Sequence, residues 1–103
     1  MYIVVFITCA NKKEAERIAG KLIRSKLAAC VNIIRDVKSR FWWQAKLDKA
    51  DELLLIAKST KAKLNKIIKL VKSLHSYEVP EIIALPIVGG NGKYLEWIDA
   101  AIG

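Results

Sequence analysis

Two segments that are apolar on both faces, residues 2–8 and 53–57, constrain the fold of this chain more than any other feature. Successive strand residues point to opposite sides of a sheet, so a strand that is apolar throughout has to be covered on both sides. Each segment is followed by a helical pattern, in residues 12–25 and 64–71, where apolar residues recur every three or four positions. The sequence therefore predicts one sheet with both segments at its centre and two helices packed against it.

The ends of the predicted helices carry recognisable signals. Asn11 stands at the N-cap position of the first helix, and Glu14 lies at the spacing that completes a capping box. Thr60 can cap the second helix. The glycine-rich residues 89–92 form a turn that leads into a short terminal helix over residues 93–101.

Two further strands complete the pattern. Residues 30–43 carry interleaved polar side chains and residues 82–88 are interrupted by Pro86, so both suit the edges of a sheet. Asp48 and Lys49 are the best candidates for the turn between the second and third strands. The order of elements predicts an α+β fold of the ferredoxin-like, split βαβ kind, with an antiparallel sheet in the order 4-1-3-2.

Length and charge bound the organisation and the partners. The chain has 103 residues, so we expect a single domain over residues 1–103. A formal net charge of +8, much of it in the lysines of residues 58–72, raises nucleic acid or an anionic ligand as partners. Arginine is scarce and no aromatic RNA-binding motif lies on a predicted strand, so nucleic acid is the less favoured of the two.

The N-terminal segment carries no export signal. No basic region precedes the apolar run of residues 2–7, and the polar residues 11–13 soon follow it. We therefore expect neither a signal peptide nor a membrane span. Without an export signal we expect a cytoplasmic protein, in which Cys9 and Cys30, which form no Cys-x-x-Cys pair, remain reduced thiols.

One face of the predicted sheet has no cover. Two long helices can cover only one face, and the terminal helix is too short to cover the other. The second strand ends in Phe41, Trp42 and Trp43, and adjacent strand residues point to opposite sides, so the two tryptophans cannot share one core. We predict a homo-oligomer in which these aromatic residues and Trp97 contact other subunits.

Residues 75–81, between the second helix and the last strand, hold the only histidine of the chain. His75 could ligate a metal ion together with Cys9, or it could form hydrogen bonds in a structural role. Tyr77 and Glu81 could form part of a ligand-binding cleft, or a buried phenol and a structural ion pair with a lysine. No nucleophile–base pair is evident, so no enzymatic activity is expected.

Four segments carry a resemblance to a known protein family. They are KLAACVNI at residues 26–33, SRFWWQAK at 39–46, HSYEVPEI at 75–82 and YLEWI at 94–98. They resemble four segments of the CutA family, the divalent-cation-tolerance proteins. In the same order, these are the second-strand segment, the Ser-x-Tyr-x-Trp-x-Gly-Lys hairpin, the His-Pro-Tyr-x-x-Pro-Glu loop and the terminal Tyr-Leu-x-Trp helix. The hairpin glycine of the family is Ala45 here, its tyrosine is Phe41, and the first proline of its loop is Ser76.

The resemblance implies a cytoplasmic homotrimer that acts in divalent-metal tolerance and binds copper. No cofactor is expected to be required, and Cu²⁺ or another divalent metal ion is the expected ligand. The resemblance also implies an architecture like that of the trimeric PII signalling proteins, so a small anionic ligand in clefts between subunits is the alternative. The residues predicted to line that cleft are Trp43, Lys46, Lys58, Tyr77 and Glu81.

The metal ligands of the family are only partly present. Copper ligation in relatives uses a histidine that matches His75, a neighbouring histidine and a cysteine of the first strand. The last two positions are Leu74 and Ile7 in this chain. The resemblance therefore implies weak metal binding by His75, with Cys9 as a second ligand two residues beyond the aligned position.

Overall fold

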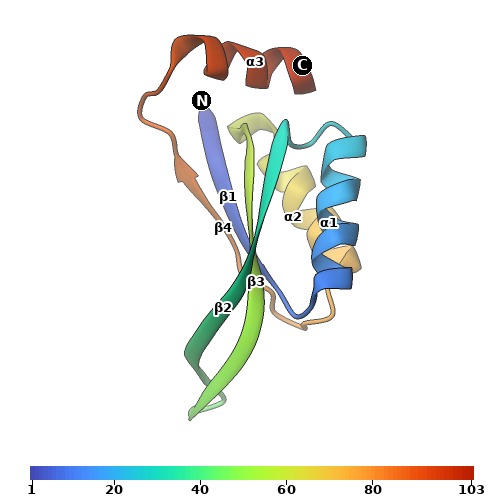
Figure 1. Ribbon diagram of the computed structural model, residues 1–103, viewed down its shortest axis with the longest axis vertical. Helices are drawn as coiled ribbons and strands as arrows, with labels where there is room; N and C mark the ends of the chain where they lie inside the picture. The colour runs from blue at the N-terminus through green and yellow to red at the C-terminus, as the bar shows by residue number, and fades with distance from the viewer.

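The computed structural model describes residues 1–103 and contains one four-stranded sheet and three α-helices (Figure 1). The elements follow in the order β1 (Tyr2–Cys9), α1 (Lys12–Arg24), β2 (Cys30–Trp43), β3 (Lys46–Thr60), a 3-10 turn (Lys61–Lys63), α2 (Leu64–Leu74), β4 (Ile82–Pro86) and α3 (Gly92–Ile102). All neighbouring strands are antiparallel, and they lie in the order β2-β3-β1-β4. This is the predicted order read from the other edge, so the α+β prediction is confirmed.

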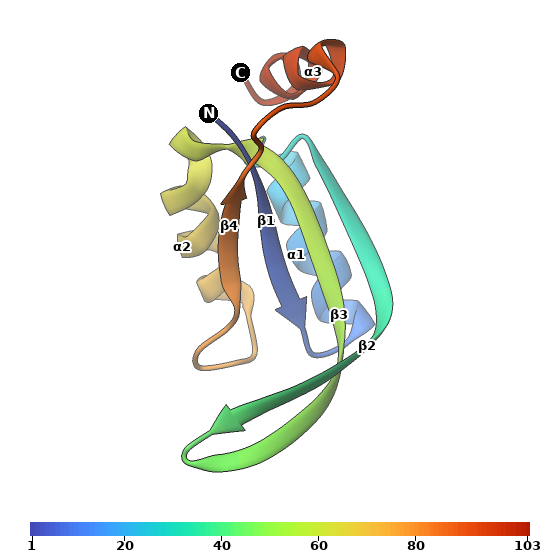
Figure 2. The same cartoon turned by 90° about the vertical axis from the view of Figure 1, so that its left-hand side faces the viewer.

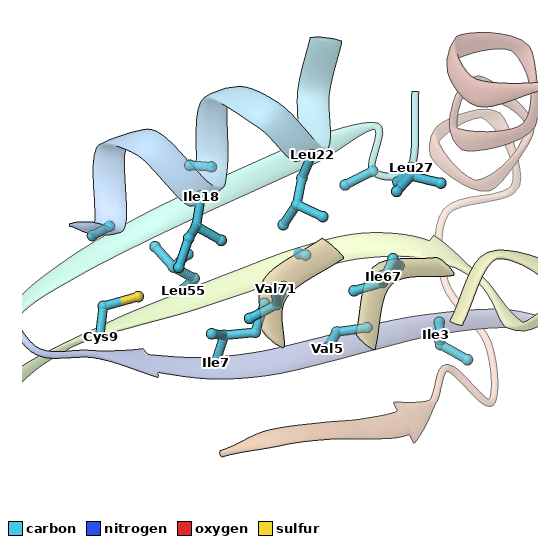
Figure 3. Packing of buried hydrophobic residues seen from close by; sticks show 14 residues of the cluster. Ile3, Val5, Ile7, Cys9, Ile18, Leu22, Leu27, Leu55, Ile67 and Val71 are labelled. Atoms are coloured by element: carbon cyan, nitrogen blue, oxygen red, sulfur yellow. The ribbon is translucent and has the colours of Figure 1, made fainter. Parts of the chain in front are cut away.

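Helices α1 and α2 lie on the same face of the sheet and enclose the hydrophobic core (Figure 2). Alternate residues of β1 point toward the helices, as the period of a strand requires. The largest contributions come from Ile3, Val5, Ile7 and Cys9 of β1, Ile18 and Leu22 of α1, Leu55 of β3, and Ile67 and Val71 of α2 (Figure 3).

The predicted capping of α1 is confirmed. The Asn11 side chain accepts a hydrogen bond from the backbone N–H of Glu14 at 2.9 Å. Glu14 reaches back to the N–H of Ala10 rather than to that of Asn11 itself. Thr60 precedes the 3-10 turn that leads into α2, but its side chain makes no capping hydrogen bond.

The opposite face of the sheet is open and apolar. Its middle row runs across all four strands through Asn32, Ile56, Phe6 and Ile83, as the pairing of the strands shows. The neighbouring rows contain Ile34, Leu54, Val4 and Leu85. Helix α3 lies beyond one end of the sheet and leaves this face uncovered (Figures 1 and 2).

The turn between β2 and β3 lies at Gln44 and Ala45, and the prediction of a turn at Asp48 and Lys49 is wrong. Both turn residues have positive φ values, 50° and 63°, which is the backbone of a two-residue hairpin whose twist matches its strands. Asp48 and Lys49 are paired within the hairpin, opposite Phe41 and Arg40. The sequence hid this turn because no glycine marks it.

Strand β3 is much longer than the predicted segment of residues 53–57, and α2 extends three residues beyond the predicted pattern of residues 64–71. The remaining boundaries differ from the predictions by only one or two residues. Strand β4 ends at Pro86 rather than Val88, although the N–H of Ile87 still donates to the carbonyl of Tyr2. Asn91 caps α3 by accepting from the N–H of Lys93. None of the helices has both the length and the apolar character needed to span a membrane.

Candidate functional site

The loop between α2 and β4 begins at His75, whose imidazole is fully buried against the end of β1. The Nδ1 atom accepts a hydrogen bond from the backbone N–H of Tyr77 at 3.0 Å. Nδ1 therefore carries no proton. The proton of the neutral ring lies on Nε2, which donates it to the carbonyl oxygen of Thr8 at 2.7 Å. Both ring nitrogens are engaged, as the structural interpretation of His75 requires.

Glu14 joins the first turn of α1 to this loop. Its carboxylate accepts hydrogen bonds from the N–H of Ala10 at 2.8 Å and from the N–H of Ser76 at 2.7 Å. Burial by itself raises the pKa of Glu14, but these hydrogen bonds and the nearby His75 outweigh it and hold the pKa below its ordinary value. The sequence predicted only the capping role of this residue.

Cys9, Glu14 and His75 form a cluster whose potential ligand atoms all lie within 4.8 Å of one another. The structure thus brings the two predicted metal-binding residues together and adds a carboxylate. Burial, together with the charges of Glu14 and Glu52, raises the pKa of the Cys9 thiol to about 12. At neutral pH this thiol is protonated, and a thiol must lose its proton before it can ligate a metal.

A cleft of about 760 Å³ lies between the β2–β3 hairpin and the loop that precedes β4. Trp43, Tyr77 and Glu81, which were predicted to line a cleft between subunits, line this cleft within the single chain. Glu52, a residue that the sequence analysis did not single out, lines it as well and is only 7% exposed. A carboxylate directly before the apolar run of residues 53–57 was the one signal that could have identified it.

The cleft contains a hydrogen bond between the side chains of Tyr77 and Glu52. The Tyr77 hydroxyl donates to Oε2 of Glu52 at 2.9 Å. Burial and this hydrogen bond raise the pKa of Tyr77 to about 12, so the phenol keeps its proton at neutral pH. Burial and the charge of Glu52 raise the pKa of Glu81 above its ordinary value.

The two predicted lysines do not line the cleft. Lys58 lies in the middle of the sheet, opposite Val4 and Cys30, with its Nζ 3.8 Å from the sulfur of Cys30. Lys46 begins β3 next to the hairpin turn. Neither lysine forms an ion pair with Glu81, since the one ion pair that a lysine or arginine makes in the protein is Lys38–Asp51.

The four aromatic residues predicted at an oligomer interface are all exposed in the single chain: Phe41, Trp42, Trp43 and Trp97. The first three lie in the hairpin, and Trp97 lies on α3, where its ring packs against that of Tyr94. Their role at an interface between subunits stays a prediction.

Solved structures with this fold include close relatives of the chain. The divalent cation tolerance protein CutA1 from Thermus thermophilus is 44% identical with a TM-score of 0.98, and the match covers 100% of both chains. A structure described as the periplasmic divalent cation tolerance protein CutA from Archaeoglobus fulgidus is 43% identical with a TM-score of 0.96, again over 100% of both chains. These names refer to tolerance of divalent cations and not to a catalysed reaction.

The relatives overturn the predicted cytoplasmic location. A rice relative, named chloroplastic CutA 1, is 50% identical over 93% of this chain, and the Archaeoglobus protein is described as periplasmic. The chain spans about half the length of the rice protein, 54%. The prediction failed because targeting segments are read separately from the folded domain, so the sequence of the domain does not report the compartment.

The match to the family extends along the whole fold. The family model described as CutA1 divalent ion tolerance protein matches residues 3–101, from β1 to the end of α3. That range contains all four segments on which the resemblance in the sequence rested, so the resemblance is confirmed. The chain belongs to the CutA1 divalent ion tolerance protein family.

Proposed function

We propose that the protein acts in divalent-cation tolerance as a homotrimeric binding protein, not an enzyme, and that it binds divalent metal ions weakly. Its relatives are named for divalent-cation tolerance. The observation that carries the metal-binding part is the cluster of Cys9, Glu14 and His75, with its ligand atoms within 4.8 Å. Imidazole and thiolate ligands suit copper, and imidazole also suits zinc.

The hydrogen bonds of His75 explain why such binding would be weak. A metal ion on Nε2 would displace the proton that is donated to Thr8, and that proton would have to move to Nδ1. Nδ1 already accepts from the N–H of Tyr77, so the loop would have to release this bond. The thiol of Cys9 would also have to lose its proton against a pKa of about 12.

Calorimetry with Cu²⁺ and Zn²⁺ tests this site. Replacing His75 with alanine is expected to weaken Cu²⁺ binding at least about tenfold, whereas Ser73→Ala, on the surface of α2, should leave it unchanged. If the Cys9 thiolate is a ligand, the affinity should rise by up to about tenfold per pH unit, because each bound ion displaces one proton. Equal affinities of wild type and His75→Ala would remove His75 from the site.

The uncovered face of the sheet supports the proposed assembly. Ile83 and Leu85 of β4 and Ile34 of β2 are all between 40% and 50% exposed on this face, where they adjoin the apolar central strands. An exposed apolar area of this kind is typical of a surface that other subunits cover. The sheet supports the need for a cover, and the number of three subunits is what the resemblance in the sequence implies.

A second candidate function is the binding of a small anion in the cleft. Lys38, Arg40 and Lys49 are among its lining residues and favour this alternative. Thermal-shift assays with inorganic phosphate and citrate would test it, with Arg40→Gln as the variant and Arg24→Gln, at the end of α1, as the charge-matched control. Stabilisation that is equal in all three proteins would count against a specific anion site.

A further inference from the structure

We propose that the outer surface of helices α1 and α2 binds the phosphate backbone of double-stranded nucleic acid. The lysine and arginine side chains of residues 12–24 and 61–72 make up this surface, which we call the basic helix surface. It lies outside both the Cys9–Glu14–His75 cluster and the cleft, so the inference goes beyond the proposed function and does not depend on it.

The net charge of the chain lies entirely in its helix layer. Residues 12–24 and 61–74 contain ten of the 18 lysine and arginine residues but only two of the ten acidic residues, Glu14 and Glu16. These two segments therefore carry a formal charge of +8, which equals that of the whole chain, and the remaining residues sum to zero. Glu14 is buried and accepts from two backbone N–H groups, so Glu16 is the one exposed carboxylate on the two helices.

The charges of the basic helix surface are exposed and have no partner within the chain. Nine of its ten basic residues are exposed, and Lys63 is partly buried. None forms an ion pair, since the one ion pair of a lysine or arginine is Lys38–Asp51 in the hairpin. Both helices lie on the face of the sheet opposite the uncovered one (Figures 1 and 2). Subunits that cover the open face would therefore leave the basic helix surface on the outside of the assembly.

The lysines of α2 and of the turn before it are placed against the local preferences of a helix. Lys61 and Lys63 precede α2 at the end where the helix dipole favours carboxylates, and the first turn contains no acidic residue. Lys63, Lys66, Lys69 and Lys72 follow one another at a spacing of three, which makes like charges neighbours on the helix. Local preferences that are broken without compensation within the chain indicate a role outside it, and an anionic partner would relieve the repulsion.

The basic helix surface lacks what a membrane-bound helix requires. Such a helix buries its apolar side in the lipid. The apolar sides of α1 and α2 are already packed in the core, through residues such as Ile18, Leu22, Ile67 and Val71. Ile23 is the one large apolar residue that is exposed on either helix. Contact with nucleic acid needs no apolar side, because the release of counterions from phosphates supplies the affinity.

The position of the aromatic residues favours a duplex over a single strand. Single strands are bound by stacking their bases on aromatic side chains. The exposed tyrosine and tryptophans lie on the hairpin and on α3, and the basic helix surface has no aromatic residue. The absence of an aromatic RNA-binding motif on a strand bears on recognition of bases and not on phosphate contacts made by helices.

The spacing of charges on α2 suits a phosphate backbone. Lys66 and Lys69 flank a hollow of about 300 Å³, which Leu70 and Ser73 also line. A phosphate in this hollow would contact both ammonium groups. Helix α2 has 11 residues and is about 16 Å long. Double-stranded DNA carries one charge per about 1.7 Å of its axis, so a stretch of duplex of this length offers about ten phosphates.

Fluorescence anisotropy with labelled DNA and RNA duplexes of about 20 base pairs, between about 50 and 200 mM salt, tests the surface. For wild type we expect the logarithm of the binding constant to fall with the logarithm of the salt concentration at a slope of about −4 to −5, as for about five phosphate contacts. The double variant Lys66→Gln, Lys69→Gln should bind at least about tenfold more weakly at the lower salt, with the slope reduced in magnitude by about 2.

A matched control separates placed charge from net charge. Arg35 and Lys93 are exposed and lie outside the helix layer. The double variant Arg35→Gln, Lys93→Gln removes the same charge, and we expect it to change the affinity less than about threefold and to keep the slope. Glutamine is a good helix former, so the α2 variant should fold, with a melting temperature equal to or above that of wild type.

Binding of both duplexes, with the loss confined to the α2 variant, supports the inference. Absence of binding by wild type at about 50 μM protein in the lower salt overturns it, as does equal weakening in the two double variants. Wild type that sediments with vesicles containing about 30% phosphatidylserine but leaves both duplexes free would also overturn it, and would assign the surface to an anionic membrane. Each result leaves the copper titration with His75→Ala as a separate test of the proposed function.

Discussion

Replacing Ile34 with lysine is expected to break the proposed trimer into monomers. Ile34 lies on the uncovered face of the sheet, opposite Leu54, and is 43% exposed in the single chain. If other subunits cover this face, the change removes about 1.5–3 kcal/mol of apolar burial from each subunit and places a charge in the contact. Each 1.4 kcal/mol is about a tenfold change in an equilibrium constant, so trimers should dissociate at micromolar concentration.

A matched control separates assembly from general effects of the substitution. Ile23 lies on α1, away from this face, and is 41% exposed, so Ile23→Lys makes the same chemical change at nearly the same exposure. We expect Ile23→Lys to keep three times the mass of the chain by light scattering and Ile34→Lys to have the mass of a monomer. Circular dichroism would show that both variants are folded. A wild-type protein with the mass of a monomer, or an Ile34→Lys variant with the wild-type mass, would contradict the proposed assembly.

The second large effect is expected at Glu14, whose replacement by glutamine should destabilise the fold by about 1–3 kcal/mol. The carboxylate accepts from the backbone N–H groups of Ala10 and Ser76. A glutamine can turn its oxygen toward only one of these donors, so its NH₂ group faces the other and leaves an unpaired N–H. The loss should be measured as a lower midpoint of urea unfolding with an unchanged slope.

The pH dependence provides a second readout for Glu14. Its pKa in the folded protein lies below the ordinary value of 4.5, so the unfolded chain binds a proton more readily than the folded one. The carboxylate therefore contributes stability that is complete above its ordinary pKa and is lost as the pH falls through the lowered pKa. We expect this part of the acid sensitivity to vanish in Glu14→Gln and to remain in Glu16→Gln, which changes an exposed carboxylate of the same helix. An unaltered acid profile in Glu14→Gln would show that Glu14 is not the titrating group.

Local patterns in the sequence were sufficient for the secondary structure and the order of the strands. The apolar runs of residues 2–8 and 53–57 required central strands, and they lie side by side in the sheet as β1 and β3. The hairpin turn is the exception among the local features. Its two residues, Gln44 and Ala45, adopt positive φ without the glycine or asparagine that usually marks such a turn.

The candidate site was accessible from the sequence only in part. His75, Tyr77 and Glu81 stood out because their loop concentrates polar residues between a helix and a strand. Glu52 did not, since its hydrogen-bond partner Tyr77 lies 25 residues further along the chain. Lys58 was predicted to line a cleft between subunits, and the register of β3 places it in the middle of the sheet, outside the cleft of the single chain.

The sequence by itself determined the fold class, the central and edge strands, the amphipathic helices and the family. Each of these rests on periodicity or on short motifs, and such signals are set by neighbours a few residues apart. Only the tertiary structure decided which nitrogen of His75 holds the proton, the hydrogen bond from the N–H of Ser76 to Glu14 across 62 residues, and the buried carboxylate of Glu52. Burial and hydrogen bonding between distant segments exist only after the chain has closed, and these two effects set the charge and the chemistry of the site.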